Sequence, residues 1–376
     1  MEEITKGSKL KVFVEKMSFG GAGIARLDNL VIFVSGAAPQ ENLLVEITKK
    51  KKRFAEAKVL EVISASPFRR ETPCKYTDKC GACQWQQFDY QEQKNQKELI
   101  FHEMLDKVDF LRGIRINSFL SGEEFRYRNR IQIRTKSKKI GFFKKASNDI
   151  VNIKDCLITE EKLTAQFNSI LKKYPSTKMQ KFELLYDKND EVILRKDKAH
   201  GEEDGFSQVN NQMNEQMQNW VLQQISDTSN NGKIYDLYAG NGNFSRFLEN
   251  QGLENSLFAI EFSEAAIQRG KKLAGSESKI EWLAAKVEDV VKKIKADENS
   301  VLIIDPPRIG CDEKFIDSLK STGAKDLIYI SCNPSTWIRD LQRLREHRDF
   351  DILSLDLLDM FPQTYHLEVL SRIRLK

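Results

Sequence analysis

The sequence predicts an α/β domain built on a parallel sheet, preceded by a half that is rich in β-structure. Residues 8–64 contain short β-rich runs separated by turns, and residues 118–205 continue a mostly β pattern. After residue 205, strands alternate with helices, which is typical of a parallel sheet. A chain of 376 residues with 40% hydrophobic content is long enough for two or three domains with real cores.

Composition restricts where the chain works and what it binds. No apolar run approaches the ~18 residues of a membrane span, and the N-terminus lacks the basic and apolar regions of a secretory signal. We therefore expect a cytoplasmic protein without membrane contact, in a reducing compartment where clustered cysteines indicate metal binding or catalysis. The 60 Lys and Arg exceed the 55 acidic residues by only 5, so a polyanionic partner is permitted but not required.

The N-terminal runs predict a small barrel. Short β-rich segments at residues 10–14, 30–34, 42–48 and 55–63 are spaced as the strands of such a barrel are. A basic block lies between the last two segments and consists of Lys49, Lys50, Lys51, Lys52 and Arg53. Such a block indicates either a solvated loop or the nucleic-acid groove of an oligonucleotide-binding barrel.

Three thiols follow the barrel at the spacing Cys-x5-Cys-x2-Cys: Cys74, Cys80 and Cys83. Three cysteines so close together in a cytosolic chain indicate a soft metal site, for which Cys156 is the candidate fourth ligand. Four thiolates suit either structural zinc or an iron–sulfur cluster. The grouping of three near ligands and one distant ligand favours the cluster.

Two further segments precede the α/β part. Residues 88–108 show the apolar periodicity of an amphipathic helix. Residues 125–134 interleave aromatic and basic residues at strand spacing, which predicts one strand face carrying Arg126, Arg128, Arg130 and Arg134. That face is either an ordinary solvated surface or a stripe that binds phosphates.

The start of the α/β part has the pattern of a nucleoside-cofactor site. A strand at residues 233–238 leads into a turn with Gly240 and Gly242, a helix follows, and a second strand ends in Glu261. Glycines let a ligand approach the backbone, and an acid after the second strand can hold ribose hydroxyls. Ser245 occupies the position of the third glycine of a phosphate loop, which favours S-adenosylmethionine over a dinucleotide.

Two later strands also end in residues capable of chemistry. The strand at 301–304 leads to Asp305, which two prolines follow; the pattern indicates a simple turn or an acid that accepts hydrogen bonds from a nucleobase. The strand at 327–331 ends at Cys332, and Asn333-Pro334 predicts a loop after it. Cys332 is then either a reactive thiol facing the ligand crevice or a buried, inert cysteine. Near the C-terminus, Glu368 is a base candidate only if a nucleophile lies close to it.

Taken in order, these motifs resemble the RNA uracil-5-methyltransferases over nearly the whole chain. The motifs are Phe-x-Gln-Val-Asn from residue 206, Asp-Leu-Tyr-x-Gly-x-Gly-Asn-Phe from 236, Asp-Pro-Pro-Arg from 305, Ser-Cys-Asn-Pro-x-Thr from 331 and His-Leu-Glu from 366. The cysteine loop and the barrel resemble the branch with a TRAM domain and a [4Fe-4S] cluster, typified by bacterial 23S rRNA enzymes. This resemblance implies a Rossmann-like methyltransferase domain that binds S-adenosylmethionine, an OB-like TRAM barrel, and a mostly β central domain carrying the cluster.

The resemblance also implies roles for individual residues. Cys332 would be the nucleophile that adds to uracil C6, Glu368 the base that removes the C5 proton, and the four cysteines above the cluster ligands. The implied cofactor-binding positions are Gln208, Tyr238, Gly240, Gly242, Asn243, Glu261 and Asp305. The chain departs from the family pattern at Ala239, where a cysteine is common, and at Lys286 or Glu288, near the expected adenine.

The predicted domains are discontinuous. Residues 1–66 form the TRAM domain, 67–85 and 118–205 the central domain, and 86–117 with 206–376 the methyltransferase domain. We expect a monomer that methylates structured RNA, with 23S rRNA as the favoured target and the T-loop of tRNA as the alternative. The target uridine would be flipped out and held by the arginine strand and the barrel. A non-catalytic RNA-binding module would not need Cys332, and an NAD-dependent oxidoreductase would need the third glycine.

Overall fold

The computed structural model describes residues 4–186, 189–196, 207–226, 232–294 and 296–376. The chain divides into two compact units. The first consists of Met1–Met104, Glu123–Asp197 and Phe361–His366, and the second of Leu105–Gly122, Lys198–Met360 and Leu367–Lys376. Among the described residues, no helix has the length and apolar character needed to cross a membrane.

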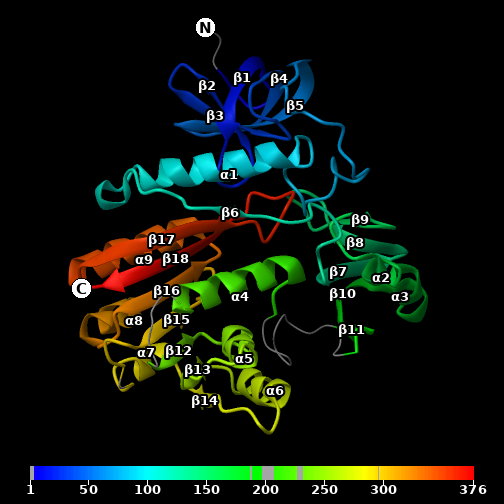
Figure 1. Cartoon of the computed structure of the whole chain (residues 1–376). Coiled ribbons are helices and arrows are strands. Elements are labelled where there is room, and N and C mark those ends of the chain that lie inside the picture. The colour runs from blue at the N-terminus through cyan, green and yellow to red at the C-terminus, as the bar shows by residue number, and fades with distance from the viewer. Residues whose placement is uncertain (1–3, 187–188, 197–206, 227–231, 295) are drawn as a thin grey trace. The chain divides into compact units, whose positions relative to one another are not determined.

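A closed barrel of five strands forms the N-terminal part of the first unit (Figure 1). Alternate residues point inward, as Leu43, Val45 and Ile47 show by being fully buried. The predicted barrel is confirmed, with one strand, β2, additional to the predicted ones. In the order in which they pair, the strands are β1 (Lys9–Met17), β2 (Gly23–Leu27), β3 (Leu30–Ser35), β5 (Phe54–Ser64) and β4 (Glu41–Lys50).

The first unit also contains a five-stranded antiparallel sheet. Its core includes Ile133, Phe182 and Leu184, and Cys83 and Cys156 belong to the same buried cluster. The cysteine sites are therefore built on the edge of this core. The strands pair in the order β11 (Val192–Lys196), β10 (Ser176–Tyr186), β7 (Arg130–Ser137), β8 (Lys139–Phe143) and β9 (Ile150–Asn152), and two short helices follow β9, α2 (Glu161–Thr164) and α3 (Phe167–Lys173).

Helix α1 (Tyr90–Leu105) belongs almost entirely to the first unit, whereas the sequence groups residues 86–117 with the catalytic segments. Its buried side chains include Gln93 and Gln96 as well as apolar residues such as Phe101. The amide of Gln93 donates to the carbonyl of Trp85 at 2.9 Å, and Gln96 accepts from the backbone N–H of Met17 at 2.8 Å. These bonds tie the helix to the barrel and the cysteine loop, which apolar periodicity could not predict. The predicted boundary at residues 205 and 206 lies outside the described residues.

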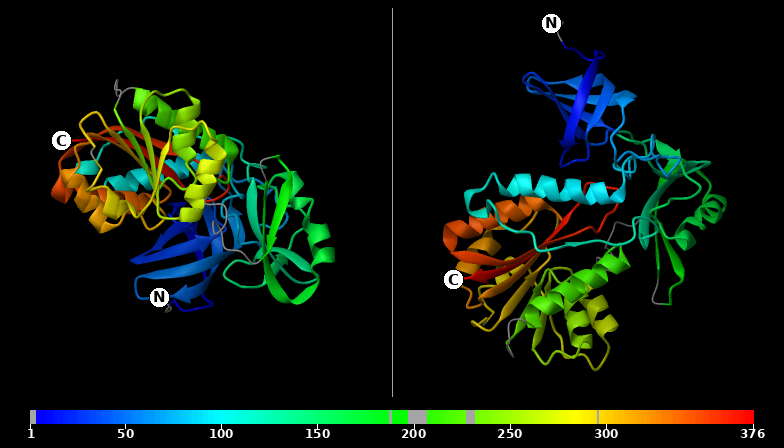
Figure 2. Two further views of the ribbon diagram at one scale, coloured as in Figure 1. Left: turned by 90° about the horizontal axis from the view of Figure 1, so that it is seen from below. Right: turned by 45° about the horizontal axis from the view of Figure 1, so that its top comes forward.

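The second unit is organised around an eight-stranded mixed sheet (Figure 2). Its first five strands are parallel; β18 runs antiparallel to both of its neighbours, and β6 is parallel to β17. The predicted parallel arrangement is thus confirmed for the first five strands. The strands pair in the order β14 (Glu281–Ala284), β13 (Leu257–Glu261), β12 (Ile234–Leu237), β15 (Val301–Ile304), β16 (Asp326–Ser331), β18 (Glu368–Leu375), β17 (Phe350–Leu358) and β6 (Phe119–Leu120).

The central strands β12, β15 and β16 are buried along their whole length, as expected of a sheet covered on both faces. Helices α4, α5 and α6 lie on one side and α7, α8 and α9 on the other (Figures 1 and 2). The strand order reverses between β12 and β15, so a ligand crevice is expected at their carboxyl ends. The helices are α4 (Asn211–Ser226), α5 (Asn243–Asn250), α6 (Glu264–Ala274), α7 (Val287–Val290), α8 (Glu313–Ser318) and α9 (Pro334–His347), with 3-10 turns at Asp109–Leu111 and Leu319–Ser321.

Candidate active site

The turn after β12 is held in left-handed backbone conformations. Tyr238, Gly240 and Gly242 have φ angles of 64°, 58° and 80°. An added Cβ would meet nothing within 4 Å at Gly240, but would lie 2.4 Å from the ring of Trp282 at Gly242. Gly240 therefore leaves space for a ligand, whereas Gly242 is required for packing. A strained non-glycine residue such as Tyr238 is typical of a functional loop.

Glu261, at the end of β13, is fixed beside this turn. One carboxylate oxygen accepts from the backbone N–H of Gly240 at 3.1 Å and the other from that of Ser263 at 2.8 Å. The next residue, Phe262, is 69% exposed, and the ammonium of Lys286 lies 5.6 Å from its ring centroid. An exposed aromatic ring beside an acid suits a nucleoside. The motifs in the sequence do not point to Phe262, although a large apolar residue directly after the acid was the available signal.

Tyr238 and Ser245 connect the turn to its surroundings. The hydroxyl of Tyr238 donates to Glu288 at 3.4 Å. Ser245 is buried, and its backbone N–H and hydroxyl donate to Asp236 at 3.0 and 2.6 Å. Burial raises the pKa of Asp236 to about 6, while these two hydrogen bonds act in the opposite direction. Ser245, at the position of the missing third glycine, therefore anchors the start of α5 to β12.

The predicted contacts Asn243 and Gln208 lie on the helix side of the turn. The amide group of Asn243 exchanges hydrogen bonds with Asn214 at 2.9 and 3.1 Å and accepts from Gln218, both on α4. This pairing holds α5 against α4. Gln208 is half-buried in the segment that leads into α4. A cofactor-binding role for either residue stays a prediction.

Three predicted residues meet at the neighbouring strand ends. Asp305 follows β15, Cys332 follows β16, and Glu368 is the first residue of β18. Because β16 and β18 are antiparallel and Ser331 pairs with Val369, Cys332 and Glu368 lie at the same edge of the sheet. Cys332 is partly buried and Glu368 is buried.

The predicted turn after β16 is confined to Cys332 and Asn333, because helix α9 begins at Pro334. Asn333 caps α9, because its side chain accepts from the backbone N–H of Ser335 at 3.1 Å. Pro334 takes the first helical position, where its missing N–H costs nothing. Asn-Pro thus ends the strand and begins the helix. The N-terminus of α9, which favours negative charge, lies next to the thiol.

The side chains at these strand ends interact electrostatically. Burial raises the pKa of Cys332 to about 12, with further contributions from Glu368 and Asp305, while Arg308 lowers it. Burial and Asp305 raise the pKa of Glu368 to about 8, again against Arg308. Burial and Asp236 raise that of Asp305 to about 7. The crevice therefore favours protonated groups near neutral pH, and Arg308, to which the sequence assigned no role, opposes this.

Cys311 provides a contrast within the same unit. It is 3% exposed, and its backbone N–H donates to Asp340 at 2.7 Å. The hydroxyl of Tyr329 donates to the same carboxylate oxygen at 2.7 Å. Cys311 is a buried structural cysteine, and Cys332 has the access that a reactive thiol requires.

In the first unit, the four predicted metal ligands line one small cavity. Cys74, Cys80, Cys83 and Cys156 face it together with apolar neighbours such as Ile153 and Ile158. Burial raises the pKa of Cys83 to about 12 and also raises those of Cys80 and Cys156, and in each case other thiols of the set add to the effect. The tertiary structure thus brings the distant Cys156 to the Cys74–Cys83 loop. Among the described residues, however, no group of three or more His, Cys, Asp or Glu side chains is arranged to hold a metal ion.

Comparisons with known proteins identify the family. The family described as tRNA (Uracil-5-)-methyltransferase matches residues 176–278 and 285–373, and a TRAM domain matches residues 3–60. An uncharacterized RNA methyltransferase of Bdellovibrio bacteriovorus is 35% identical over 98% of this chain and 95% of its own length. The chain belongs to the RNA uracil-5-methyltransferase family.

Other relatives of this methyltransferase carry more specific names. The 23S rRNA (uracil(1939)-C(5))-methyltransferase RlmD of Shewanella halifaxensis is 28% identical over 98% of this chain and 96% of that protein. The crystal structure of Pyrococcus abyssi tRNA (uracil-54, C5)-methyltransferase with S-adenosyl-L-homocysteine superposes with a TM-score of 0.73, at 21% identity, over 96% of this chain and 99% of that one. The predicted methyltransferase fold and the TRAM barrel are confirmed.

The prediction that the four arginines lie on one face of a strand is wrong. Strand β7 begins only at Arg130, which is buried and paired with Glu183 at 3.4 Å. Arg126 precedes the strand with a φ angle of 54° and binds Asp155 at 2.7 Å. Arg128 also precedes β7, whereas Arg134 lies on the strand with its guanidinium 5.4 Å from the ring centroid of Phe143. The four side chains therefore do not share one exposed face.

The basic block of the TRAM barrel lies where β4 turns into β5. Lys51, Lys52 and Arg53 are exposed, and Lys50 is half-buried and donates to the carbonyl of Lys51 at 2.7 Å. This arrangement fits both a solvated loop and an RNA contact. RNA binding by these residues stays a prediction.

Proposed function

We propose that this enzyme transfers a methyl group from S-adenosylmethionine to C5 of one uridine in 23S rRNA, giving 5-methyluridine. The observation that carries the proposal is the partly exposed thiol of Cys332 at the same sheet edge as the buried carboxyl group of Glu368. A nucleophile with a nearby base is what this reaction needs. A module that only binds RNA would need neither.

The turns after β12 and β13 suit the methyl donor. Gly240 leaves an open wall, Glu261 can accept from ribose hydroxyls, and Phe262 with Glu288 can receive an adenine. Asp305 lies between this half of the crevice and Cys332, where a carboxylate would attract the positive sulfonium. The P. abyssi tRNA methyltransferase structure contains S-adenosyl-L-homocysteine, which supports the same ligand class here.

The chemistry divides between Cys332 and Glu368. The Cys332 thiolate forms a bond to C6 of the uracil, and the electron pair of the C5–C6 double bond moves to C5 and its carbonyl. C5 then attacks the methyl carbon, whose bond to sulfur breaks, and the donor leaves as S-adenosylhomocysteine. The Glu368 carboxylate removes the C5 proton. The double bond re-forms and the Cys332 thiolate is expelled.

The electrostatics of the crevice set the conditions for this sequence. A thiol with a pKa of about 12 is a poor nucleophile unless its surroundings change. Protonation of Glu368, whose pKa is about 8, removes one source of repulsion at neutral pH. Arg308 and the N-terminus of α9 favour the thiolate. Glu368 must then lose its proton before it can act as the base.

Several observations favour 23S rRNA as the substrate. The Shewanella relative named for 23S rRNA aligns along almost its full length, whereas the likeness to the archaeal tRNA enzyme, at 21% identity, is one of fold. The T-loop of tRNA is the second candidate because the family description names tRNA. We expect a monomer acting in the cytoplasm. Mapping 5-methyluridine in rRNA and tRNA from cells lacking the gene separates the two targets.

The four cysteines of the first unit fit a [4Fe-4S] cluster. They line one cavity with apolar walls, and burial raises the pKa of Cys80, Cys83 and Cys156, whose thiolates a bound metal would stabilise. The cluster would stabilise the loop from Cys74 to Cys83 against Cys156. No step of methyl transfer depends on it.

RNA containing 5-fluorouridine tests the covalent step, because fluorine at C5 leaves no proton to remove. The wild-type protein with S-adenosylmethionine should form an adduct with 5-fluorouridine 23S rRNA that survives denaturing electrophoresis. Cys332→Ala should form none, while Cys311→Ala, which alters a buried cysteine of the same unit, should still form it. An adduct with Cys332→Ala would reject the nucleophile assignment.

A further inference from the structure

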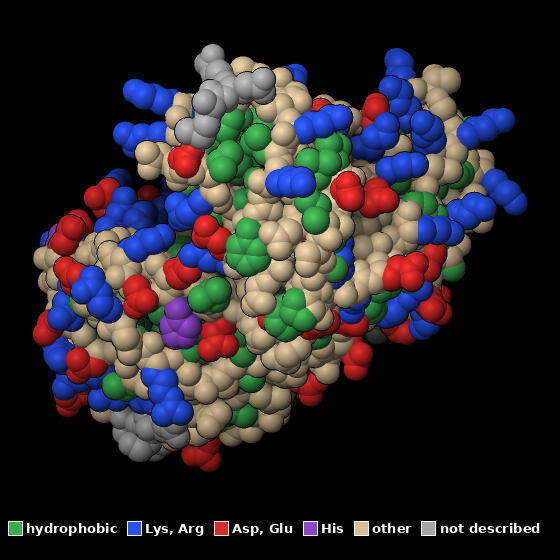
Figure 3. All heavy atoms as spheres, turned by 90° about the horizontal axis from the view of Figure 1, so that it is seen from above, with side chains coloured by type: hydrophobic (Ala, Val, Ile, Leu, Met, Phe, Trp, Pro, Cys, Tyr) green, Lys and Arg blue, Asp and Glu red, His purple; other side chains and the backbone are tan. Residues whose placement is uncertain are grey.

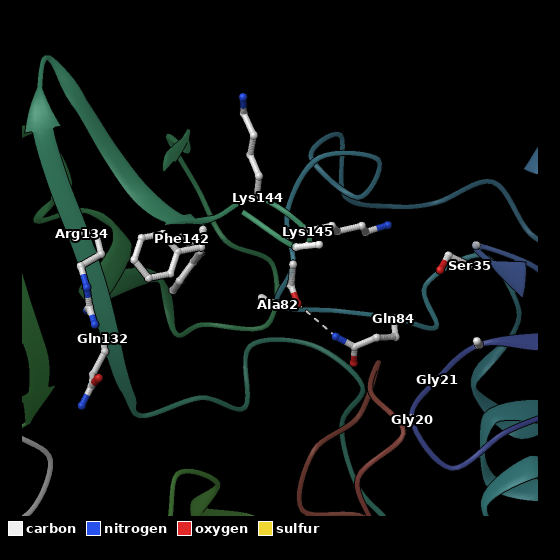
Figure 4. Close-up of a pocket in the computed structure, with 15 residues that line it drawn as sticks. Gly20, Gly21, Ser35, Ala82, Gln84, Gln132, Arg134, Phe142, Lys144 and Lys145 are labelled. Atoms are coloured by element: carbon white, nitrogen blue, oxygen red, sulfur yellow. Dashed lines mark hydrogen bonds between the residues drawn. The ribbon is translucent and has the colours of Figure 1, made fainter. Parts of the chain in front are cut away.

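One groove of the first unit has none of Cys332, Glu368 and Asp305 among its lining residues. It has a volume of about 580 Å³ and is lined by the β1–β2 turn, the end of β3, the cysteine loop, and strands β7 and β8 with the turn that follows (Figure 4). This volume is in the range of pockets for nucleotide-sized ligands. Nothing in the methyl-transfer chemistry uses the groove.

One wall of the groove is basic and aromatic. Arg134 of β7 lines it, with its guanidinium over the ring of Phe143, and Lys144 and Lys145 lie along its edge. None of the residues that line the groove is acidic. Lys144 is paired with Asp149 at 3.1 Å, but both side chains are largely exposed, so the pair is weak and can be exchanged for a phosphate. Figure 3 shows Lys and Arg side chains gathered over part of one molecular face.

The opposite wall is nearly free of side chains. Gly20 and Gly36 have φ angles of 122° and 82°, and an added Cβ at either would meet nothing within 4 Å. Gly21 packs closely on Gln84, whose amide donates to the carbonyl of Gly81 at 3.0 Å. A glycine wall lets a polymer backbone approach the protein closely. Figure 4 shows Gln84, Gly20 and Gly21 across the groove from Arg134 and Gln132.

The cysteine loop joins the two walls. The indole N–H of Trp85 donates to the carbonyl of Gly21 at 3.0 Å, which attaches the loop to the glycine wall. The backbone N–H of Gly81 donates to the carbonyl of Phe143 at 3.0 Å, and Cys80 forms a β-bridge with Lys144. Both walls are therefore held by hydrogen bonds to the same loop. These hydrogen bonds make the groove part of the folded unit.

We propose that this groove binds a single-stranded segment of the substrate RNA outside the target uridine. The phosphates contact Arg134, Lys144 and Lys145, and a base packs against the arginine–phenylalanine pair. Cationic and aromatic side chains along one groove are the features that bind single strands, and only an unpaired base offers its face for stacking. The inference rests on the proposed function for the identity of the RNA. The proposed phosphate contacts differ from the predicted stripe of four arginines, and only Arg134 belongs to both sets.

Equilibrium binding of a fluorescein-labelled oligouridine to the full-length protein tests the groove. The double variant Arg134→Gln/Lys145→Gln should raise Kd about 10-fold and reduce the slope of log Kd against log salt concentration by about 1.4, the value for two lost phosphate contacts. Arg134→Lys, which keeps the charge, should recover part of the affinity. The matched control Lys172→Gln/Lys178→Gln removes two exposed lysines of the same unit outside the groove and should change neither quantity.

Two results would overturn the proposal. One is an unchanged Kd and salt slope in the groove variant while circular dichroism shows it folded. The other is an equal loss in the lysine control, which would mean that only net charge matters. Failure of the proposed function would appear elsewhere, as absence of 5-methyluridine formation by the wild-type protein. The two failures are therefore distinguishable.

Discussion

Glu368 opens strand β18 at the edge of the sheet where Cys332 follows β16, with Ser331 paired to Val369 between the two antiparallel strands. This pairing sets a carboxyl group from the C-terminal strand beside the thiol. Glu368 is accordingly the first cause, after burial, of the raised pKa of Cys332. The titrations of the two groups are therefore coupled, because ionisation of Glu368 raises the pKa of the thiol.

The first prediction concerns the thiol itself. Above pH 8, where Glu368 is ionised, its charge opposes formation of the Cys332 thiolate. Glu368→Gln and Asp305→Asn should therefore move alkylation of Cys332 by iodoacetamide to lower pH, and Arg308→Gln should move it to higher pH. Peptide mass spectrometry across a pH series measures this. Cys311 should stay unmodified as an internal control. If the pH profiles of alkylation coincide in all three variants, the electrostatic arrangement is contradicted.

The second prediction concerns the base. Glu368→Gln should methylate its RNA once and then retain it, because the C5 proton of the adduct is not removed. Steady-state turnover should fall by about 100-fold or more, the usual contribution of a positioned base. Tritiated S-adenosylmethionine, followed by denaturing electrophoresis, should show label on the protein–RNA band. Normal turnover by this variant would mean that another group is the base.

The third prediction concerns stability. The pKa of Glu368 is raised from 4.5 to about 8 in the folded protein, so the protonated carboxyl group favours the folded state. This contribution to the free energy of unfolding is fully present below the unfolded pKa and is lost as pH rises through about 8. Glu368→Gln should stabilise the protein at pH 9, by up to about 5 kcal/mol, and have little effect near pH 4. Thermal melts at the two pH values measure this.

Glu298 provides the matched control for stability. Its exposed carboxylate pairs with Lys325 at 2.8 Å, which lowers its pKa. The ion pair of Glu298 contributes to the free energy of unfolding above the unfolded pKa of this carboxyl group. Glu298→Gln removes that contribution, so the substitution should not stabilise the protein at pH 9. An equal gain from both substitutions would show that the effect comes from net charge and not from burial of Glu368.

The fourth prediction concerns the cysteine cavity. Anaerobically purified protein should be brown and contain iron, and Cys83→Ser or Cys156→Ser should lower the iron content, whereas Cys311→Ser should not. Because the loop that carries Cys83 also joins the walls of the groove, loss of the metal should weaken binding of the oligouridine probe. Elemental analysis and the binding assay measure the two effects. Stoichiometric zinc in a colourless preparation would exclude the cluster.

The strand ends of the second unit were largely predictable. The continuous apolar run at 301–304 coincides with β15, and short runs before Tyr238 and Cys332 also become buried strands. Such runs have one stable environment, a parallel sheet covered on both faces, so local sequence indicates the site at its carboxyl edge. The helix after Cys332 was missed because Asn-Pro both ends a strand and begins a helix.

The arginines illustrate the opposite case. Alternation along residues 125–134 does not reveal where the strand starts, and β7 starts only at Arg130. Burial of Arg130 depends on Glu183 of β10, a residue far away in sequence. Helix α1 shows the same limit, because Gln93 and Gln96 are buried by bonds to Trp85 and Met17. Partners supplied by distant strands and loops cannot be inferred from local periodicity.

The sequence by itself determined the order of the elements, the motifs at the strand ends and the family to which they point, since these depend on residue type and spacing along one segment. Only the tertiary structure decided which side chains share an environment: Cys332 with Glu368, Cys156 with the Cys74–Cys83 loop, and Arg134 with the glycine wall. The physical reason is that burial and charge depend on neighbours that strand pairing and loop contacts bring together from distant parts of the sequence.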